Sequence, residues 1–177
     1  MRRVLVPLDI SLHLPEPGST LHELGGATMG TTWSVKLMAA PGQQGRLTAL
    51  GEQLQDALDV VIAQMSHWEN DSNLSRFNRA PAGNWHQLPA ELFTVVEYAL
   101  SVAEASGGAY DPCAGALVNS WGFGARKRYD QDGFYAPGAG DIAAIVQRGD
   151  RQRVRLDPIG RRLLQPGAAQ LDLSSVA

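Results

Sequence analysis

Cysteine is almost absent from this 177-residue chain, and its scarcity excludes several kinds of site. Cys113 is the one cysteine, so the sequence allows neither an internal disulfide nor a metal site built from several thiolates. The four histidines, His13, His22, His67 and His86, do not have the spacing of a metal-ligand set. We interpret Cys113 as a packing residue, because nothing in the sequence places an activating group beside its thiol.

Long apolar runs and an excess of positive charge are also missing. No apolar stretch approaches about 18 residues, so we predict no membrane span. The apolar stretch near the N-terminus is interrupted at Pro7 and Asp9, and neither a signal-peptide core nor a lipobox cysteine is present. We therefore expect a cytoplasmic protein. A net charge of −3 argues against a general nucleic-acid binder, and we predict no nucleic-acid partner.

The composition that remains is ordinary for a globular domain, with 44% hydrophobic and 19% charged residues. A chain of this length buries about 70% of the surface that its unfolded form exposes, which suffices for one core. The periodic patterns and motifs lie between Gly25 and Ala177. We assign residues 25–177 to one domain and residues 1–24 to a proline-containing lead segment.

Hydrophobic periodicity predicts the longest elements. Apolar and polar residues alternate over residues 32–38, which predicts a half-buried strand. Apolar residues recur at steps of three and four over residues 47–65, which predicts a helix of about five turns. A second helix is predicted to begin near Pro89 and to end at Gly107 and Gly108.

Shorter elements are predicted elsewhere along the chain. From Ser66 onward the polar residues favour a loop, and residues 122–140 favour a long connection. Asp141 is the predicted N-cap of a short helix over residues 142–147. Short strands are predicted at residues 154–156, 162–164 and 170–173. Helices followed by short strands favour an α+β fold with packed helices and a short-strand antiparallel sheet.

Basic residues gather in the second half of this chain. Arg151, Arg153 and Arg155 alternate along the sequence, which predicts that they share one face of a strand. Such a face is either solvated or in contact with a substrate diphosphate or an acidic partner. The pattern alone leaves these alternatives open.

One glycine-rich segment favours a loop that approaches a ligand. It is Ser106-Gly107-Gly108-Ala109-Tyr110-Asp111-Pro112. The two glycines lack a Cβ, so their backbone can take positive φ or lie against another group. Pro112 biases Asp111 toward extended geometry and thereby fixes the direction of its carboxylate. The alternative interpretation is a helix C-cap followed by a turn.

Other motif blocks accompany this loop. They are Met29-Gly30-Thr31-Thr32-Trp33, the segment from Met65 to Arg79 with Met-Ser-His-Trp and Ser-Asn-Leu-Ser-Arg-Phe-Asn, Trp121-Gly122-Phe123-Gly124, and the segment from Gln170 to Ala177 with Leu-Asp-Leu-Ser-Ser-Val. In this order the blocks resemble the N-terminal portion of the ApbE family, the FAD:protein FMN transferases. The resemblance covers residues 25–177 and implies an ApbE-like α+β fold that is incomplete at its C-terminus.

The resemblance implies a set of FAD-binding residues. Trp68 follows a predicted helix in a polar loop, and a base stacked on such a ring gains about 1–3 kcal/mol; a satellite core position is the alternative. Met29 offers a flexible thioether to a ring, with core packing as its alternative. Ala109, Tyr110 and Asp111 correspond to the flavin-contacting loop of the family.

Further residues are weaker candidates for contact with the ligand, and one is a candidate metal ligand. Ser75 and Asn78 are possible ligand contacts, with turn capping the alternative for Asn78, and Trp121 is a predicted pocket wall. Asp172 is predicted to anchor the turn or the nucleotide. The family reaction uses Mg²⁺, and Ser175 lies where the family contributes one metal-binding oxygen.

By resemblance, the whole protein moves FMN from FAD to a Thr or Ser hydroxyl of an acceptor flavoprotein and releases AMP. The family blocks that complete the metal site are expected beyond Ala177, so the catalytic residues are unknown and this chain by itself is expected to be inactive. Three alternatives stay open: an FAD diphosphatase that uses water as acceptor, a non-catalytic flavin-binding module, and an interaction domain without a ligand.

Overall fold

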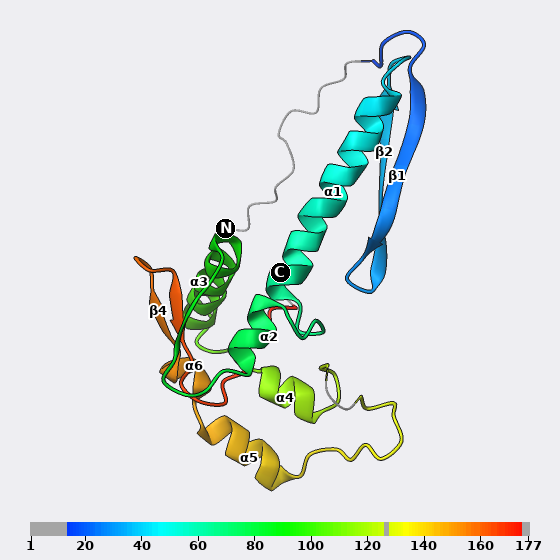
Figure 1. The fold of residues 1–177 in the computed structure, drawn as a ribbon. Helices are drawn as coiled ribbons and strands as arrows, with labels where there is room; N and C mark the ends of the chain where they lie inside the picture. The colour runs from blue at the N-terminus through cyan, green and yellow to red at the C-terminus, as the bar shows by residue number, and fades with distance from the viewer. Residues whose placement is uncertain (1–13, 126–127, 175–177) are drawn as a thin grey trace. The chain divides into compact units, whose positions relative to one another are not determined.

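The structure is a computed structural model that describes residues 14–125 and 128–174. The chain divides into two compact units, Met1–Ala57 and Leu58–Ala177. Helix α1 (Gln44–Met65) crosses the boundary between them (Figure 1). Within the described residues, none of the helices combines the length and the apolar character needed to cross a bilayer.

The first unit is built on a β-hairpin. Strands β1 (Thr20–Thr28) and β2 (Thr31–Ala39) pair antiparallel over their full length. Their two-residue turn consists of Met29 with φ 47° and Gly30 with φ 74°. Two successive positive φ angles match the right-handed twist of paired strands, which is why such turns close hairpins.

The hairpin extends further toward the N-terminus than the sequence predicts. β2 confirms the strand predicted at residues 32–38, but β1 was not predicted. The predicted boundary after residue 24 lies inside β1, because this strand begins at Thr20. The last residues of the predicted lead segment therefore belong to the sheet.

Helix α1 confirms the first predicted helix and packs on the hairpin through Gln55. The Trp33 indole N–H donates to Gln55 Oε1 at 2.9 Å, and Gln55 Nε2 donates to the Ala27 carbonyl oxygen at 3.1 Å. A Cβ on Gly26 would lie 2.5 Å from Gln55 Oε1, so glycine is required where the helix approaches the strand.

In the second unit, α3 (Ala90–Ala105) confirms the other predicted helix. Pro89 is its N-cap. At the opposite end, Gly107 and Gly108 have φ 62° and 89°, and their N–H groups donate to the Glu104 and Ala103 carbonyl oxygens. The glycine pair therefore ends the helix as predicted, since both positions favour a residue without a Cβ.

Four shorter helices complete the second unit: α2 (Asn73–Asn78), α4 (Gly115–Ser120), α5 (Ala139–Gln147) and α6 (Asp150–Arg153). α2 lies where a loop was predicted, and α4 was not predicted. The predicted N-cap position of Asp141 is wrong, because Gly138 is the N-cap of α5. Asp141 lies three residues further on and still helps to cap the helix, since its carboxylate accepts from the Gly138 N–H at 3.1 Å.

A small antiparallel sheet has the strand order β3-β5-β4, formed by Trp85–Gln87, Arg162–Leu164 and Arg155–Asp157. β5 and β4 confirm two predicted strands, β4 shifted by one residue. The strand predicted at residues 170–173 is wrong, because this segment makes only a bridge between Gln170 and Ala114.

The shared strand face predicted for three arginines is also wrong. Arg151 and Arg153 lie in the single turn of α6, and only Arg155 is on a strand. Arg153 and Arg155 donate to nearby carbonyl oxygens of Pro166 and Gln152. Alternation over five residues cannot distinguish a short helical turn from a strand.

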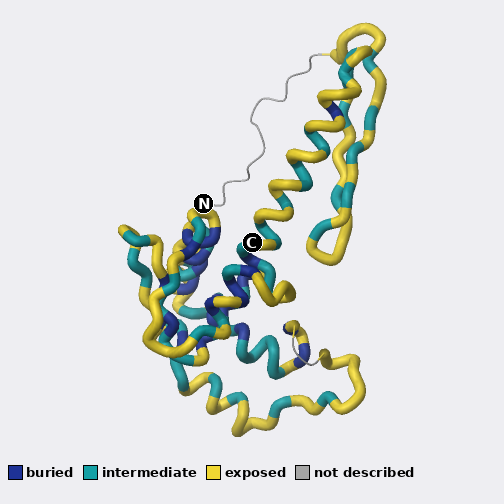
Figure 2. The backbone as a smooth tube through the Cα atoms, in the orientation of Figure 1, coloured by how far each residue is buried: buried dark blue, intermediate teal, exposed yellow. Residues whose placement is uncertain are grey.

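The core of the second unit lies between its helices and the small sheet (Figure 2). Its buried members are Met65, Leu74, Phe77, Leu88, Leu92, Phe93, Val96, Ala99, Cys113, Val154, Leu163, Ala169, Leu171 and Leu173. The buried residues of α3 are Leu92, Phe93, Val96, Ala99 and Ala103. The fold class is confirmed: an α+β chain with small antiparallel sheets and packed helices.

Candidate functional site

A polar cavity of about 200 Å³ lies within the second unit. Its lining consists of His67, Trp68, Asn70, Ser75, Asn78, Arg79, Gly115, Asn119, Gly124, Ala125, Gln170, Leu171 and Asp172. Segments that are far apart in the sequence thus meet at one site. Three motif blocks contribute to the lining, those that begin at Met65, Trp121 and Gln170, together with Gly115 and Asn119 of α4 and with Ala125.

Trp68 stands at the rim of this cavity, just after the end of α1. The residue is 52% exposed, so a ligand can reach part of it. The His67 ring lies 5.2 Å from the Trp68 ring, centroid to centroid, at 41°. The predicted position of Trp68 outside the apolar core is confirmed, whereas its contact with flavin stays a prediction.

Serine hydroxyls build the loop that holds Trp68. Ser66 Oγ accepts from the N–H groups of Trp68 and Glu69 at 3.1 and 3.2 Å. The Ser66 carbonyl oxygen accepts from the hydroxyls of Ser72 and Ser75. Ser72 also caps α2 by accepting from the Ser75 N–H at 2.9 Å. The serines of this motif therefore fix a backbone shape.

Asn78 connects this block to the last described segment. Its Nδ2 donates to the Leu171 carbonyl oxygen at 2.9 Å, and its Oδ1 accepts from the Leu171 N–H at 2.8 Å. Asp172 N–H donates to the Pro112 carbonyl oxygen at 2.9 Å. Its carboxylate accepts from the Ser174 N–H and hydroxyl. Asn78 and Asp172 line the cavity while holding its wall together.

Gln170 closes the cavity from the side of α4. The Gly115 N–H donates to the Gln170 carbonyl oxygen at 3.0 Å, and Asn119 Nδ2 donates to Gln170 Oε1 at 2.7 Å. A Cβ on Gly124 would lie 1.9 Å from Asn119 Oδ1, so a side chain there would displace the amide. Trp121 does not line the cavity, and its predicted wall role is not supported.

The loop with Ala109, Tyr110 and Asp111 follows α3 and does not line the cavity. The Tyr110 N–H donates to Ser106 Oγ at 3.2 Å. Asp111 Oδ1 accepts from the Cys113 N–H at 2.8 Å, and Asp111 Oδ2 lies 3.9 Å from Arg151 Nε. The backbone bond between Pro112 and Asp172 joins this loop to the cavity wall.

Cys113 is buried in the core behind this loop. Burial raises the pKa of its thiol to about 12, and the carboxylates of Asp111 and Asp150 add to that increase. A thiol with such a pKa stays protonated near neutral pH and is a poor nucleophile. The interpretation of Cys113 as a packing residue agrees with this placement.

Met29 belongs to the first unit, in the turn between β1 and β2. It is 53% exposed, and its φ of 47° is rare for a residue with a Cβ. Unusual backbone of this kind persists where the surroundings hold it, often at functional positions. The placement is compatible with the predicted ligand role, which stays a prediction.

The predicted metal ligand Ser175 lies outside the described residues. Among the residues that are described, no three side chains of His, Cys, Asp or Glu converge on one point. The Asp172 carboxylate accepts two hydrogen bonds from Ser174 through the same oxygen. The role of Ser175 as a metal ligand therefore stays a prediction.

Several cavity residues were missed by sequence reasoning. His67, Arg79, Asn119 and Gln170 line the cavity, and the Arg79 guanidinium donates to the Asn70 carbonyl oxygen. His67 and Arg79 lie inside a motif block, so their proximity to Trp68 was the one available signal. Gln170 begins another motif block, but its contacts with Gly115 and Asn119 have no local sequence signal because these residues lie more than fifty positions away.

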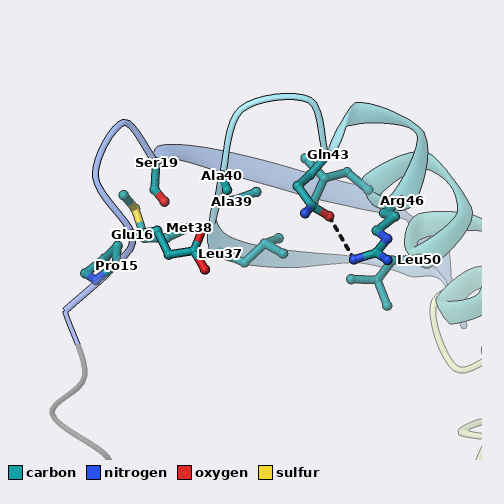
Figure 3. Close-up of a pocket in the computed structure, with 11 residues that line it drawn as sticks. Pro15, Glu16, Ser19, Leu37, Met38, Ala39, Ala40, Gln43, Arg46 and Leu50 are labelled. Atoms are coloured by element: carbon teal, nitrogen blue, oxygen red, sulfur yellow. Dashed lines mark hydrogen bonds between the residues drawn. The ribbon is translucent and has the colours of Figure 1, made fainter.

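A larger, open cavity of about 640 Å³ lies in the first unit, where the hairpin meets the start of α1 (Figure 3). Leu37, Met38 and Leu50 give it an apolar side, and Arg46 donates to Gln43 Oε1 at 3.3 Å across its edge. None of the predicted site residues lines it. Size alone does not make it the better candidate, because the chemistry-bearing motifs meet at the smaller cavity.

Comparison with known proteins gives one consistent result. The ApbE family model matches residues 29–177. A protein of Klebsiella pneumoniae strain 342 named FAD:protein FMN transferase is 34% identical over 163 residues, which are 90% of this chain and 45% of that relative. A Vibrio cholerae protein of the same name is 38% identical over 133 residues, 73% of this chain and 39% of the relative.

Solved structures agree with these relatives. The apo form of the Pseudomonas stutzeri flavinyl transferase ApbE superposes with a TM-score of 0.75 at 30% identity, covering 90% of this chain and 51% of that one. The Vibrio cholerae flavin transferase ApbE gives a TM-score of 0.74 at 30% identity, with 89% and 49% covered. The chain spans about half the length of these proteins or less. With a family match over most of its residues, this chain belongs to the ApbE family.

Proposed function

We propose that this chain is the N-terminal portion of an FAD:protein FMN transferase and that its polar cavity binds part of FAD. The observation that supports the proposal most directly is the convergence of three motif blocks on one cavity, with Trp68 exposed at its rim. A flat ring system can stack on that indole, while the amides of Asn119 and Gln170 offer donors and acceptors.

The proposed reaction is a phosphoryl transfer. The bond between the FMN phosphorus and the bridging diphosphate oxygen breaks, and AMP leaves with that oxygen. A Thr or Ser hydroxyl oxygen of the acceptor flavoprotein forms the new bond to phosphorus and loses its proton. Binding and positioning account for much of the catalysis in such transfers. We assign those roles to residues of this chain.

The same proposal includes the remaining implied residues. Met29 and the loop from Ala109 to Asp111 contact FAD. Ser175 would contribute one oxygen to a Mg²⁺ ion, which would supply neutralisation of charge on the phosphoryl oxygens. No catalytic step is assigned to the described residues through the metal.

Titration of the chain with FAD tests the binding part. Trp68→Ala should weaken FAD binding by roughly tenfold to a hundredfold, since stacking contributes about 1–3 kcal/mol. Trp85→Ala is the matched control, because Trp85 is also an exposed tryptophan of the second unit but does not line the cavity. Equal losses in both variants, or no loss in a folded Trp68 variant, would exclude Trp68 from the site.

Product analysis tests the reaction. With FAD, Mg²⁺ and an acceptor flavoprotein that contains a Thr or Ser attachment site, a transferase releases AMP and increases the acceptor mass by one FMN unit. Free FMN and AMP without labelled protein indicate an FAD diphosphatase. In a protein that also carries the remaining ApbE blocks, FAD binding without either product indicates a flavin-binding module, and no binding at all indicates an interaction domain.

A further inference from the structure

Ser66, the first residue after α1, makes hydrogen bonds through its backbone and its side chain. Its N–H donates to the Ile62 carbonyl oxygen at 3.1 Å, which continues the hydrogen-bond pattern of the helix by one residue. Its carbonyl oxygen accepts from two serine hydroxyls of the neighbouring α2 segment. Ser66 is therefore fixed to two helices through its backbone alone.

The side chain of Ser66 makes separate hydrogen bonds, to the residues that follow it. Its hydroxyl oxygen accepts from the N–H groups of Trp68 and Glu69, at 3.1 and 3.2 Å. The hydrogen bond to the Trp68 N–H restricts the backbone from which the indole projects. The ring is half exposed, so packing contributes less to its orientation than it would in a core.

We propose that Ser66 is a positioning residue that holds the Trp68 ring in the orientation that stacks on the flavin nucleotide. This inference rests on the proposed function, in which Trp68 contacts FAD. Ser66 does not line the cavity, so it acts through Trp68 and not by its own contact with the ligand. A ring already held in place loses less conformational freedom when the ligand binds.

Ser66→Ala in the full chain removes the acceptor and keeps the backbone. We expect FAD affinity to fall by about threefold to tenfold, the fold-change that corresponds to one or two ordinary hydrogen bonds. Ser66→Thr keeps the hydroxyl and should restore affinity to within about twofold of the wild type. Ser101→Ala is the matched control, since the Ser101 hydroxyl bonds the Tyr98 carbonyl oxygen on the exposed face of α3.

A double-mutant cycle tests whether the effect passes through the ring. Adding Ser66→Ala to Trp68→Ala should change FAD affinity by less than about twofold, because the residue that Ser66 positions is gone. The same loss of affinity with and without Trp68 would overturn the proposal. So would a Ser66→Ala variant that binds FAD as tightly as the wild type.

A measurement without ligand separates this inference from the proposed function. In protein labelled with 5-fluorotryptophan, the ¹⁹F signal assigned to Trp68 should shift or broaden in Ser66→Ala and return in Ser66→Thr. An unchanged signal overturns the positioning role even if FAD binds. If the wild-type chain fails to bind FAD while the signal responds as expected, the proposed function fails and the orienting role of Ser66 stands.

Discussion

Gly124 allows a direct test of the cavity wall, because its replacement by alanine adds a single carbon atom, the Cβ. A Cβ at Gly124 would lie 1.9 Å from Asn119 Oδ1 and 2.7 Å from Asn119 Cγ. Real contacts of this length do not occur, so Gly124→Ala must turn the Asn119 amide away. That movement breaks the 2.7 Å hydrogen bond from Asn119 Nδ2 to Gln170 Oε1.

The expected effects on stability and on binding differ in size. Losing one partly buried hydrogen bond lowers the free energy of unfolding by about 0.5–1.5 kcal/mol. Alanine recovers about 0.4–1 kcal/mol by restricting the unfolded chain. The net loss for Gly124→Ala is therefore about 1 kcal/mol or less, whereas FAD affinity should fall by about threefold to tenfold as the polar wall rearranges.

Urea denaturation and FAD titration measure the two effects, with Gly51→Ala as the matched control. Gly51 lies inside α1 with no atom within 4 Å of an added Cβ, so alanine there should stabilise the chain by about 1 kcal/mol and leave FAD affinity unchanged. In an Asn119→Ala background the clash disappears, and Gly124→Ala should then have no further effect on affinity. Additive losses in that background would refute the reasoning.

Three other predictions concern charge, the thiol and the strained turn. Arg79→Gln should lower FAD affinity by about tenfold and leave riboflavin affinity unchanged, because only FAD carries a diphosphate that the guanidinium can bind. The control is Arg76→Gln, which replaces a neighbouring arginine that does not line the cavity. Parallel losses for both flavins would contradict a contact between Arg79 and the diphosphate. Cys113 should not react with a thiol reagent at pH 8 until denaturant is added, since the pKa of its thiol is raised to about 12. The contribution of Cys113 to stability should decline above pH 9, where the thiol ionises in the unfolded chain but not in the folded one. Rapid labelling of the native protein would disprove its burial. Met29→Gly should change the free energy of unfolding by less than about 1 kcal/mol, because glycine relieves the left-handed backbone and so offsets the lost side-chain contacts. The same substitution should weaken FAD binding. Unchanged binding would remove Met29 from the site.

The elements that the sequence predicts correctly are those with several turns or a full strand of periodic signal. α1 and α3 repeat their apolar positions over four turns or more, so the helical period is distinct from any other. The Gly107-Gly108 pair is equally informative, because both residues have the positive φ that ends a helix. β2 has the strict alternation of a strand with one covered face.

The missed elements depend on capping and on distant contacts. α2 has six residues and is specified by the Ser72 cap, while α4 begins where the Gly115 N–H bonds the Gln170 carbonyl oxygen. Fewer than two turns give no measurable period. The Ser72 cap is a local signal for α2, but the same serine also suits a turn, which is how the sequence was interpreted. A contact with a segment more than fifty positions away has no local sequence signal, so α4 could not be located in advance.

The candidate site shows the same division in a different form. The motif residues Ser66, Ser72 and Asn78 direct their hydrogen bonds to backbone groups of the loop and of the segment at Leu171. A motif match therefore reports first that the loop has the family's shape. Trp68 differs, because its ring is exposed at the rim and Ser66 bonds only its backbone N–H. The chemical inference consequently depends on the few side chains that the scaffold presents to the cavity without using them to hold the loop. For this reason experiments on Trp68 carry more information about function than further matches to the motif.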